Sequence, residues 1–143
     1  MLSNTCKYAI RSVVYLSVFV KGNKKIGIKE IAKTLELPSP FLGKILQNLV
    51  RHGILISTKG PNGGFMLKRA PQDISLMDII EVIDGHEMFD TCLVRNAHCG
   101  DEEPCAIHDK VTLIREELKQ MFINQTIDDL ATEFRRDSKR IRI

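Results

Sequence analysis

The sequence lacks the features that mark a membrane protein, an exported protein or an enzyme. No stretch approaches the ~20 consecutive apolar residues that a helix needs to cross a bilayer. Residues 1–22 have no basic segment ahead of a clean apolar run, so they do not resemble an export signal. The patterns H-E-x-x-H, G-x-S-x-G and the P-loop are absent. We therefore expect a cytoplasmic protein that is not an enzyme and has no small-molecule substrate.

Acidic residues are nearly missing from the first half of the 143-residue chain. Residues 1–70 contain twelve Lys and Arg against two acids, Glu30 and Glu36, which gives a formal charge of +10. Residues 71–143 contain nine against sixteen, which gives −7. Lys and Arg displace counterions from a polyanion such as DNA. This charge asymmetry therefore fits a basic half that faces phosphates, joined to an acidic half with another function. A chance imbalance on a solvated face is the alternative.

Three helices and a hairpin are predicted in the basic half. Apolar residues recur at helical spacing over residues 5–20, over 28–35 and from Phe41 to Val50. Ser39 is the predicted N-cap of the third helix, with Pro40 at its first position, and Gly53 is its predicted C-terminal cap. Two short apolar runs then flank the glycine-rich turn 59–64, which predicts a β-hairpin.

This order predicts a mainly α fold with a small β-hairpin wing, a winged helix-turn-helix. The third helix can enter a major groove ~12 Å wide, and the hairpin can reach a minor groove. In the helix, Gln47 and Asn48 are expected to read an adenine edge, whereas Lys44 and Arg51 hold phosphates. The predicted DNA-binding residues are Ser39, Pro40, Gly43, Lys44, Gln47, Asn48 and Arg51 in the helix and Lys59, Gly60, Gly63 and Gly64 in the wing.

Three of the four cysteines lie in residues 85–106, an aperiodic segment that we predict to be a loop. The pattern is Cys92-x6-Cys99-x5-Cys105-x2-His108. An odd cluster in a chain without an export signal argues against a disulfide framework. Zinc sites usually contain a closely spaced cysteine pair, whereas the wide spacing here suits an iron-sulfur cluster with ligands on different irons. A thiol redox switch and unligated cysteines are the alternatives.

The apolar residues of the next helix form a narrow seam. They fall at Ile107, Val111, Ile114, Leu118 and Met121, in alternating steps of four and three. This spacing is typical of a helix that packs against a copy of itself, so we expect a homodimer; an ordinary surface helix is the alternative. A capping box at Thr126 and Asp129 predicts a short last helix. The predicted parts are thus a winged domain (1–84), a cysteine loop (85–106), a dimerisation helix with a short last helix (107–135) and a flexible tail (136–143).

Two motifs stand out in the third helix and the hairpin: Ser39-Pro40-x-Leu42-x-Lys44-Ile45-Leu46-x-x-Leu49 and Gly53-Ile54-Leu55-x-Ser57-x-Lys59-Gly60-Pro61-x-Gly63-Gly64-Phe65-x-Leu67. With them, the chain resembles the IscR/NsrR-type (Rrf) family of bacterial winged-helix regulators. The likeness extends from Lys7-Tyr8-Ala9 through Ile74-Ser75-Leu76-x-Asp78-Ile79-Ile80 to the cysteine loop, and so covers nearly the whole chain. The resemblance implies a homodimeric transcription regulator, expected to be a repressor, that binds double-stranded promoter DNA under the control of an iron-sulfur cluster.

The resemblance also implies a ligand set. Cys92, Cys99 and Cys105 match the family's cysteine ligands, and His108 matches the fourth ligand of IscR-like members that hold a 2Fe-2S cluster. The interval between Cys92 and Cys99 is one residue longer here than in those members. A 2Fe-2S cluster is favoured, and a 4Fe-4S cluster is the alternative. NsrR-like members complete a 4Fe-4S cluster with an N-terminal residue of the partner subunit, and Cys6 lies in that region. As a small apolar residue on the first helix, Cys6 is otherwise expected to be buried.

One residue and two rival hypotheses also bear on function. Gly43 departs from IscR-like members that carry an acidic residue at that position, so promoter preference cannot be copied from a relative. A cofactor-free or zinc-bearing regulator of the same fold, with Cys99 or another thiol as oxidant sensor, is one rival hypothesis. An interaction protein that controls a metabolic enzyme through its acidic half is the other.

Overall fold

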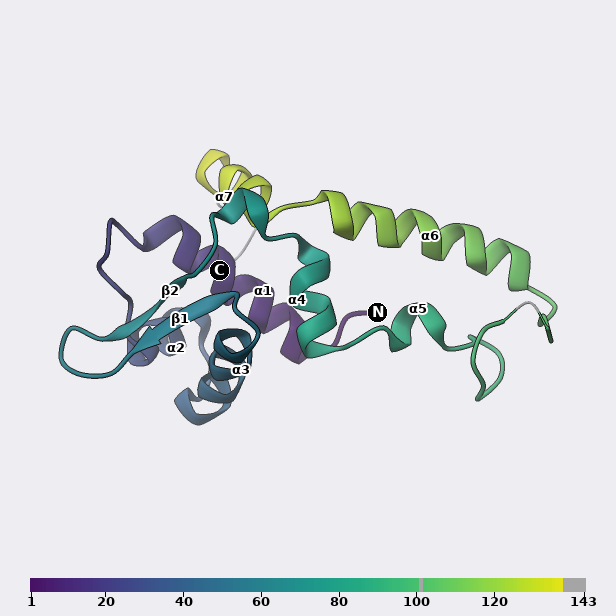
Figure 1. Ribbon diagram of the computed structural model, residues 1–143, viewed down its shortest axis with the longest axis horizontal. Helices are drawn as coiled ribbons and strands as arrows, with labels where there is room; N and C mark the ends of the chain where they lie inside the picture. The colour runs from purple at the N-terminus through teal and green to yellow at the C-terminus, as the bar shows by residue number, and fades with distance from the viewer. Residues whose placement is uncertain (101, 138–143) are drawn as a thin grey trace.

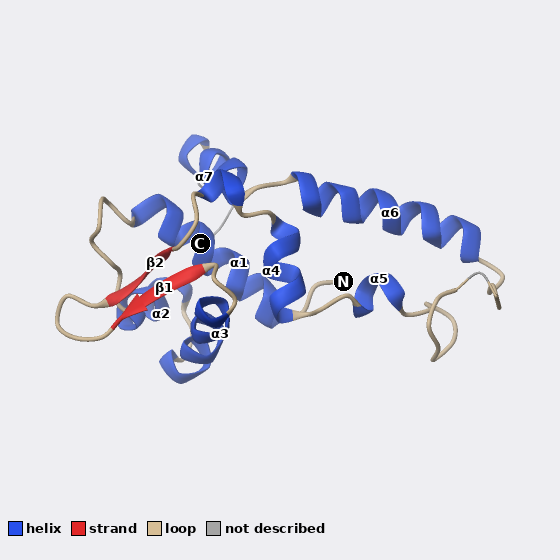
Figure 2. Ribbon diagram, in the orientation of Figure 1, coloured by secondary structure: helices blue, strands red, loops and turns tan. Residues whose placement is uncertain are grey.

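The computed structural model describes residues 1–100 and 102–137, which form a winged-helix body and a long helical arm (Figure 1). Helices and the one hairpin are distinguished in Figure 2. The elements are α1 (Asn4–Phe19), α2 (Ile28–Leu35), α3 (Ser39–Arg51), β1 (Leu55–Thr58), β2 (Gly64–Leu67), the 3-10 turn η1 (Pro71–Asp73), α4 (Leu76–Ile83), α5 (Glu87–Asp90), α6 (His108–Asn124) and α7 (Ile127–Arg136). Among the described residues, no helix is both long and apolar enough to cross a membrane.

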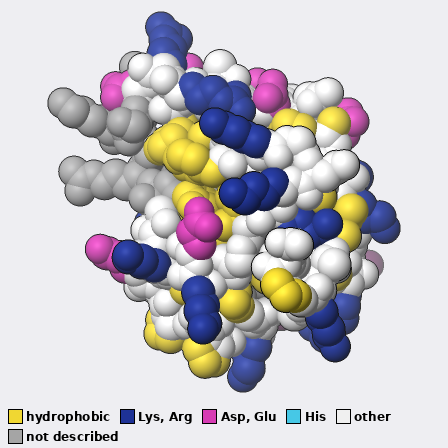
Figure 3. Space-filling model, turned by 90° about the vertical axis from the view of Figure 1, so that its left-hand side faces the viewer, with side chains coloured by type: hydrophobic (Ala, Val, Ile, Leu, Met, Phe, Trp, Pro, Cys, Tyr) yellow, Lys and Arg dark blue, Asp and Glu magenta, His cyan; other side chains and the backbone are white. Residues whose placement is uncertain are grey.

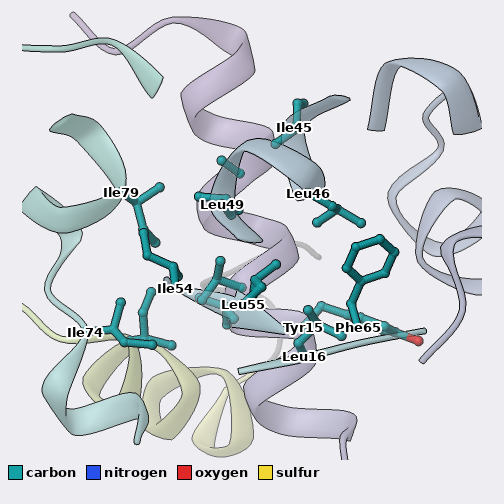
Figure 4. Close-up of a cluster of buried hydrophobic side chains, with 14 of the residues drawn as sticks. Tyr15, Leu16, Ile45, Leu46, Leu49, Ile54, Leu55, Phe65, Ile74 and Ile79 are labelled. Atoms are coloured by element: carbon teal, nitrogen blue, oxygen red, sulfur yellow. The ribbon is translucent and has the colours of Figure 1, made fainter. Parts of the chain in front are cut away.

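The body has one apolar core, built where α1, α3 and α4 meet the hairpin (Figure 4). Leu16 of α1, Leu49 of α3 and Ile79 of α4 are fully buried there, together with Leu55 of β1 and the preceding Ile54. Burying a leucine or isoleucine contributes about 1.5–3 kcal/mol. This core fixes the inner face of α3, so the outer face of α3 is left for other contacts.

The two ends of α3 differ in how well the sequence predicts them. The prediction that Ser39 caps the helix is wrong: Pro38 is the N-cap, and Ser39 and Pro40 are the first two helical residues. Pro38 has an extended backbone, with φ −61° nearly fixed by its ring and ψ 128°, so the helix starts one residue earlier. At the other end Gly53 has φ +74° and donates to Val50 O, while Ile54 N donates to Leu49 O. These bonds form a Schellman motif and confirm Gly53 as the C-terminal cap.

The predicted hairpin is confirmed. Leu55 pairs with Leu67 and Thr58 with Gly64 in an antiparallel register. Ile26, in the segment between α1 and α2, adds a further bridge, because its N–H and C=O both bond to Phe65, at 3.1 and 2.8 Å. At Phe65, β2 therefore has a hydrogen-bonded neighbour on each edge, β1 on one side and Ile26 on the other.

Two capping boxes set where α4 and α7 begin. Asp78 N donates to Ser75 Oγ and Ser75 N donates back to the Asp78 carboxylate, at 3.1 and 2.9 Å. Thr126 and Asp129 make the same exchange at the start of α7. The box at Thr126 and Asp129 confirms the sequence prediction. α7 then returns to the body, where Phe134 lies edge-on to Phe19 of α1 with ring centroids 6.0 Å apart.

The arm consists of α6 and the cysteine loop beside it (Figure 1). The sequence predicts an unbroken loop over 85–106, but the structure contains α5 there, a single turn too short to show a helical pattern. Phe89 of α5 packs against Phe122 of α6, with ring centroids 6.3 Å apart. Of the predicted flexible tail, Arg136 belongs to α7 and residues 138–143 lie outside the described residues.

Apolar side chains of α6 are exposed at intervals of seven. Ile107, at the start of the helix, is 40% exposed, Ile114 is 64% exposed and Met121 is 47% exposed. The other two seam residues, Val111 and Leu118, are half-buried. Exposed apolar side chains at this spacing are what a coiled-coil partner would cover.

Candidate functional site

The outer face of α3 and the wing carry the predicted DNA-binding side chains. Lys44, Gln47 and Arg51 are exposed on α3, and Lys59 is exposed in the wing turn. Pro40 is also exposed, and Ser39 is half-buried. Lys and Arg side chains are spread over the end of the molecule that includes the wing turn (Figure 3). The surface therefore offers cations at the two places where a winged helix meets phosphates.

Two of the predicted α3 residues are used inside the protein. The side-chain amide of Asn48 donates from Nδ2 to Val82 O at 3.2 Å, so it faces the end of α4. Gly43 lies where a Cβ would come within 3.2 Å of Ile28 Cδ1 on α2. The glycine thus lets α2 and α3 approach closely, which is a packing reason for its presence.

The wing glycines also have packing roles. A Cβ on Gly63 would overlap the carbonyl of Thr58, and a Cβ on Gly64 would overlap the carbonyl of Ile26. Gly64 has φ +137°, a conformation almost confined to glycine. A Cβ on Gly60 would meet nothing within 4 Å, although its φ is +103°. Among these glycines, Gly60 has the open space that a close approach to DNA needs.

We expect Gly64→Ala to destabilise the protein more than Gly60→Ala. Both variants carry backbone strain of about 1–3 kcal/mol. Only the first adds the overlap with the Ile26 carbonyl, worth about 1–3 kcal/mol more. Urea unfolding of the two variants measures the difference, and equal losses would contradict this account of the wing.

The cysteine loop places Cys99 beside His108. Cys99 Sγ lies 3.5 Å from His108 Nδ1, and His108 is only 9% exposed as the first residue of α6. The backbone N–H of Cys99 donates to Asp90 O at the end of α5. A bridge between Thr91 and His98 folds the intervening segment back on itself. The second and fourth predicted ligands are therefore already paired.

The first and third predicted ligands form a second pair. The thiol of Cys105 and the guanidinium of Arg95 hydrogen-bond to Cys92, which is 7% exposed. Backbone N–H groups of Val94 and Arg95 also donate to the Cys92 sulfur, and these bonds lower the pKa of Cys92 to about 7 despite its burial. Arg95 in turn lies 3.3 Å from the Glu103 carboxylate. The loop thus stabilises a thiolate at Cys92.

The four predicted ligands stand as two pairs rather than as one closed cage. Within residues 1–100 and 102–137, no group of three or more His, Cys, Asp and Glu side chains is arranged to hold a single metal ion. Two pairs of soft donors, Cys92 with Cys105 and Cys99 with His108, are chemically suited to a cluster of two irons, each of which takes two protein ligands. The donor set therefore fits an iron-sulfur cluster better than a mononuclear zinc.

Cys6 lies apart from both pairs. It is fully buried in the core of the body, and this burial, together with the nearby Asp84 carboxylate, raises its pKa to about 12. A thiol held protonated in an apolar core is a poor metal ligand. The structure therefore places Cys6 as the small apolar core residue that the sequence suggests.

Sequence reasoning missed the two arginines that hold the cysteine loop. Arg95 bonds to Cys92 and Glu103, and Arg115 of α6 donates to Thr91 O. Neither residue lies in a periodic pattern or at a ligand-like spacing. The only available signal is the presence of cations inside an otherwise acidic, cysteine-rich segment.

Comparisons with known proteins agree with this architecture. A "Putative HTH-type transcriptional regulator" of Aquifex aeolicus is 33% identical over 132 residues, which cover 91% of this chain and 90% of the relative. The structure of CymR (YrzC), the global cysteine regulator of B. subtilis, superposes with a TM-score of 0.77 at 25% identity, over 93% of this chain and 97% of that one. IscR of T. potens has the same fold, with a TM-score of 0.73 at 20% identity over 93% and 87% of the two chains.

Family membership follows from the sequence match over most of the chain. Residues 2–133 match the Rrf2 family, which is described as an iron-dependent transcriptional regulator. The family consists of transcriptional regulators, which implies binding to DNA. The mainly helical winged fold, the resemblance seen in the sequence and this match agree, and we conclude that the chain belongs to the Rrf2 family of transcriptional regulators.

Proposed function

We propose that this chain is a homodimeric repressor whose binding to promoter DNA is controlled by an iron-sulfur cluster on Cys92, Cys99, Cys105 and His108. The observation that carries the proposal is the presence of two soft-donor pairs in the loop between α4 and α6. Those two helices connect the pairs to the winged body and to the exposed apolar seam. A change in the conformation of the loop can therefore act both on the winged body, which binds DNA, and on the contact between the subunits.

A 2Fe-2S cluster is the form that the donor pairs favour. Cys92 and Cys105 would serve one iron, and Cys99 and His108 the other. When bound, such a cluster supplies a centre that responds to oxygen, nitric oxide or iron shortage. The chain itself supplies Arg95, which stabilises the Cys92 thiolate, and Arg115, which holds the loop backbone at Thr91.

DNA would be bound by two subunits, with α3 in the major groove and the wing at the adjacent minor groove. In this arrangement Gln47 reads base edges, whereas Lys44, Arg51 and Lys59 contact phosphates. The exposed α6 seam pairs the subunits so that they meet half-sites about one helical turn apart. Promoter DNA lies in the bacterial cytoplasm, which is where we place the protein.

The test compares the cluster-bound and cluster-free protein on the same DNA. Protein purified without air is expected to be coloured, with iron and acid-labile sulfide, and an operator is selected from genomic fragments with that protein. The affinities of the two forms should differ by about 5- to 150-fold, the usual range of allosteric coupling. Both affinities should fall steeply with salt. Equal affinities of the two forms on every fragment would refute cluster control.

A thiol switch is the second candidate, and the Cys92–Cys105 contact favours it. An ionised Cys92 can attack peroxide, and the resulting sulfenic acid can condense with Cys105 to a disulfide. The two thiols lose two electrons and two protons in total, and the peroxide is reduced to two waters. Protein purified without air that is colourless, contains no sulfide and loses two free thiols on peroxide treatment would support this candidate over the cluster.

A further inference from the structure

The last turn of α4 is held from two sides, and the cysteine loop begins directly after it. Asn48 of α3 donates its side-chain amide to the carbonyl of Val82 in this turn. Ser3, the N-cap of α1, donates its backbone N–H to the carboxylate of Asp84, the C-cap of α4, at 2.8 Å. Gly85 follows with φ +69°, and the chain then enters α5. This turn is therefore the place where the body meets the loop.

The hydrogen bond from Asn48 satisfies a group that the helix itself leaves open. The last four carbonyls of a helix have no intrahelical N–H partner, and Val82 is one of these. Its carbonyl can only accept, so the side chain of Asn48 must present Nδ2 to it and turn Oδ1 outward. Arg51 Nη2 lies 3.4 Å from that oxygen. Both polar atoms of the Asn48 amide are thus engaged within the protein.

The path from this turn to the first ligand is short and hydrogen-bonded. Thr91 N donates to Glu87 O across α5, and Asp90 O accepts the N–H of Cys99. Phe89 of α5 also packs against α6. A movement of the loop around Cys92 and Cys99 is therefore passed along α5 to the end of α4, with Gly85 as the only glycine between them.

We propose that Asn48 is a positioning residue that couples the state of the cysteine loop to α3 through its hydrogen bond to Val82, and that it does not read DNA. The inference rests on the proposed function. The last turn of α4 has two states, one bonded to Asn48 and one frayed. The cluster-bound loop favours the bonded state, and the cluster-free loop favours the frayed one. In the bonded state Asn48 holds the C-terminal half of α3 in place, and in the frayed state α3 loses that support.

Asn48→Asp tests the bond with the least change of shape, because it keeps the size of the side chain and removes the donor. Asn48→Ala is the second variant, and Gln47→Ala, at the exposed neighbouring position, is the matched control. Operator affinity is measured for the cluster-bound and cluster-free forms of each, together with a panel of single-base changes in the operator. Iron and sulfide counts check that every variant holds its cluster.

Both Asn48 variants should move the affinity ratio of the two forms about fivefold towards one, the equilibrium effect of one ordinary hydrogen bond. Base preference should stay as in the wild type. Gln47→Ala should instead relax base preference and keep the ratio. If Asn48→Asp changed base preference and left the ratio intact, Asn48 would be a DNA reader and the coupling proposal would be wrong.

Hydrogen exchange gives a readout that does not depend on DNA. The amides of Asp84 and Gly85 both donate to Ile80 O, so their protection reports whether the last turn of α4 is formed. In cluster-bound Asn48→Asp they should exchange as fast as in the cluster-free wild type. Unchanged protection in the variant overturns the coupling alone. A wild-type affinity ratio of one overturns the proposed function and the coupling with it.

Discussion

Cys105→Ser is expected to yield a colourless protein without acid-labile sulfide when it is purified without air. The substitution removes one of the two thiols of the Cys92–Cys105 pair, and a serine hydroxyl at neutral pH is a far weaker ligand for iron than a thiolate. One donor cannot hold an iron that needs two protein ligands, so the whole cluster should be lost. The visible spectrum and the iron and sulfide counts per chain measure the result, and operator affinity should equal that of the cluster-free wild type.

Cys6→Ala is the matched control for this substitution. It also removes a thiol, but the thiol is buried in the core of the body and is held protonated. The variant should keep the wild-type spectrum and sulfide content, with a modest loss of stability from the missing sulfur atom. Loss of the cluster in Cys6→Ala, or its retention in Cys105→Ser, would show that the ligand set proposed above is wrong. His108→Ala tests the fourth ligand in the same assay, and an unchanged spectrum would remove His108 from the set.

Ile114→Glu is expected to convert the proposed dimer into monomers. Ile114 is 64% exposed at the middle of the α6 seam, and burial of an isoleucine contributes about 1.5–3 kcal/mol. A two-fold interface contains both copies, so the loss of about 3–6 kcal/mol should raise the dimer dissociation constant at least about 100-fold. Light scattering coupled to gel filtration at low micromolar concentration should therefore show the mass of one chain.

Leu113→Glu is the matched control, because it tests an exposed apolar residue of α6 outside the seam. Leu113 is 69% exposed and lies next to Ile114, but it is outside the steps of four and three that define the seam. Its replacement adds the same charge and removes a similar apolar area, yet the mass measured by light scattering should still be that of a dimer. Equal effects of the two variants would mean that α6 is an ordinary surface helix or that another face of it pairs. Because one subunit contacts only one half-site, Ile114→Glu should also weaken operator binding.

The sequence predicts the elements of this fold well where local chemistry decides them. Gly53 ends α3, and Thr126 with Asp129 starts α7, as their backbone and side-chain preferences require. The start of α3 differs, because Pro38 acts on the backbone one residue before the expected serine cap. Such one-residue shifts depend on neighbouring turns and cannot be taken from the helix pattern alone.

The sequence predicts which residues belong to the candidate site better than it predicts which contacts their side chains make. Asn48 follows the exposed Gln47 in the sequence, yet it lies on a different side of α3, where its amide donates to Val82 O of α4. Gly63 and Gly64 suggest an opening for DNA, whereas their missing side chains make room for the chain itself at Thr58 and Ile26. In each case a contact distant in sequence decides the role. Cys92, Cys99, Cys105 and His108 were identifiable from spacing, but their division into two pairs comes from the folding of the loop.

The start of α4 and the end of α6 meet at one place. Leu76 N donates to Gln125 O and Ile127 N donates to Ile74 O, so the chain positions on either side of the excursion are hydrogen-bonded neighbours. An excursion with adjacent ends can be lengthened, shortened or exchanged at little entropic cost to the rest of the protein. Because Ile79 of α4 belongs to the core of the body, α4 would have to stay. The body could thus acquire a different segment in place of the cysteine loop and α6, while its α3 and wing surfaces are kept.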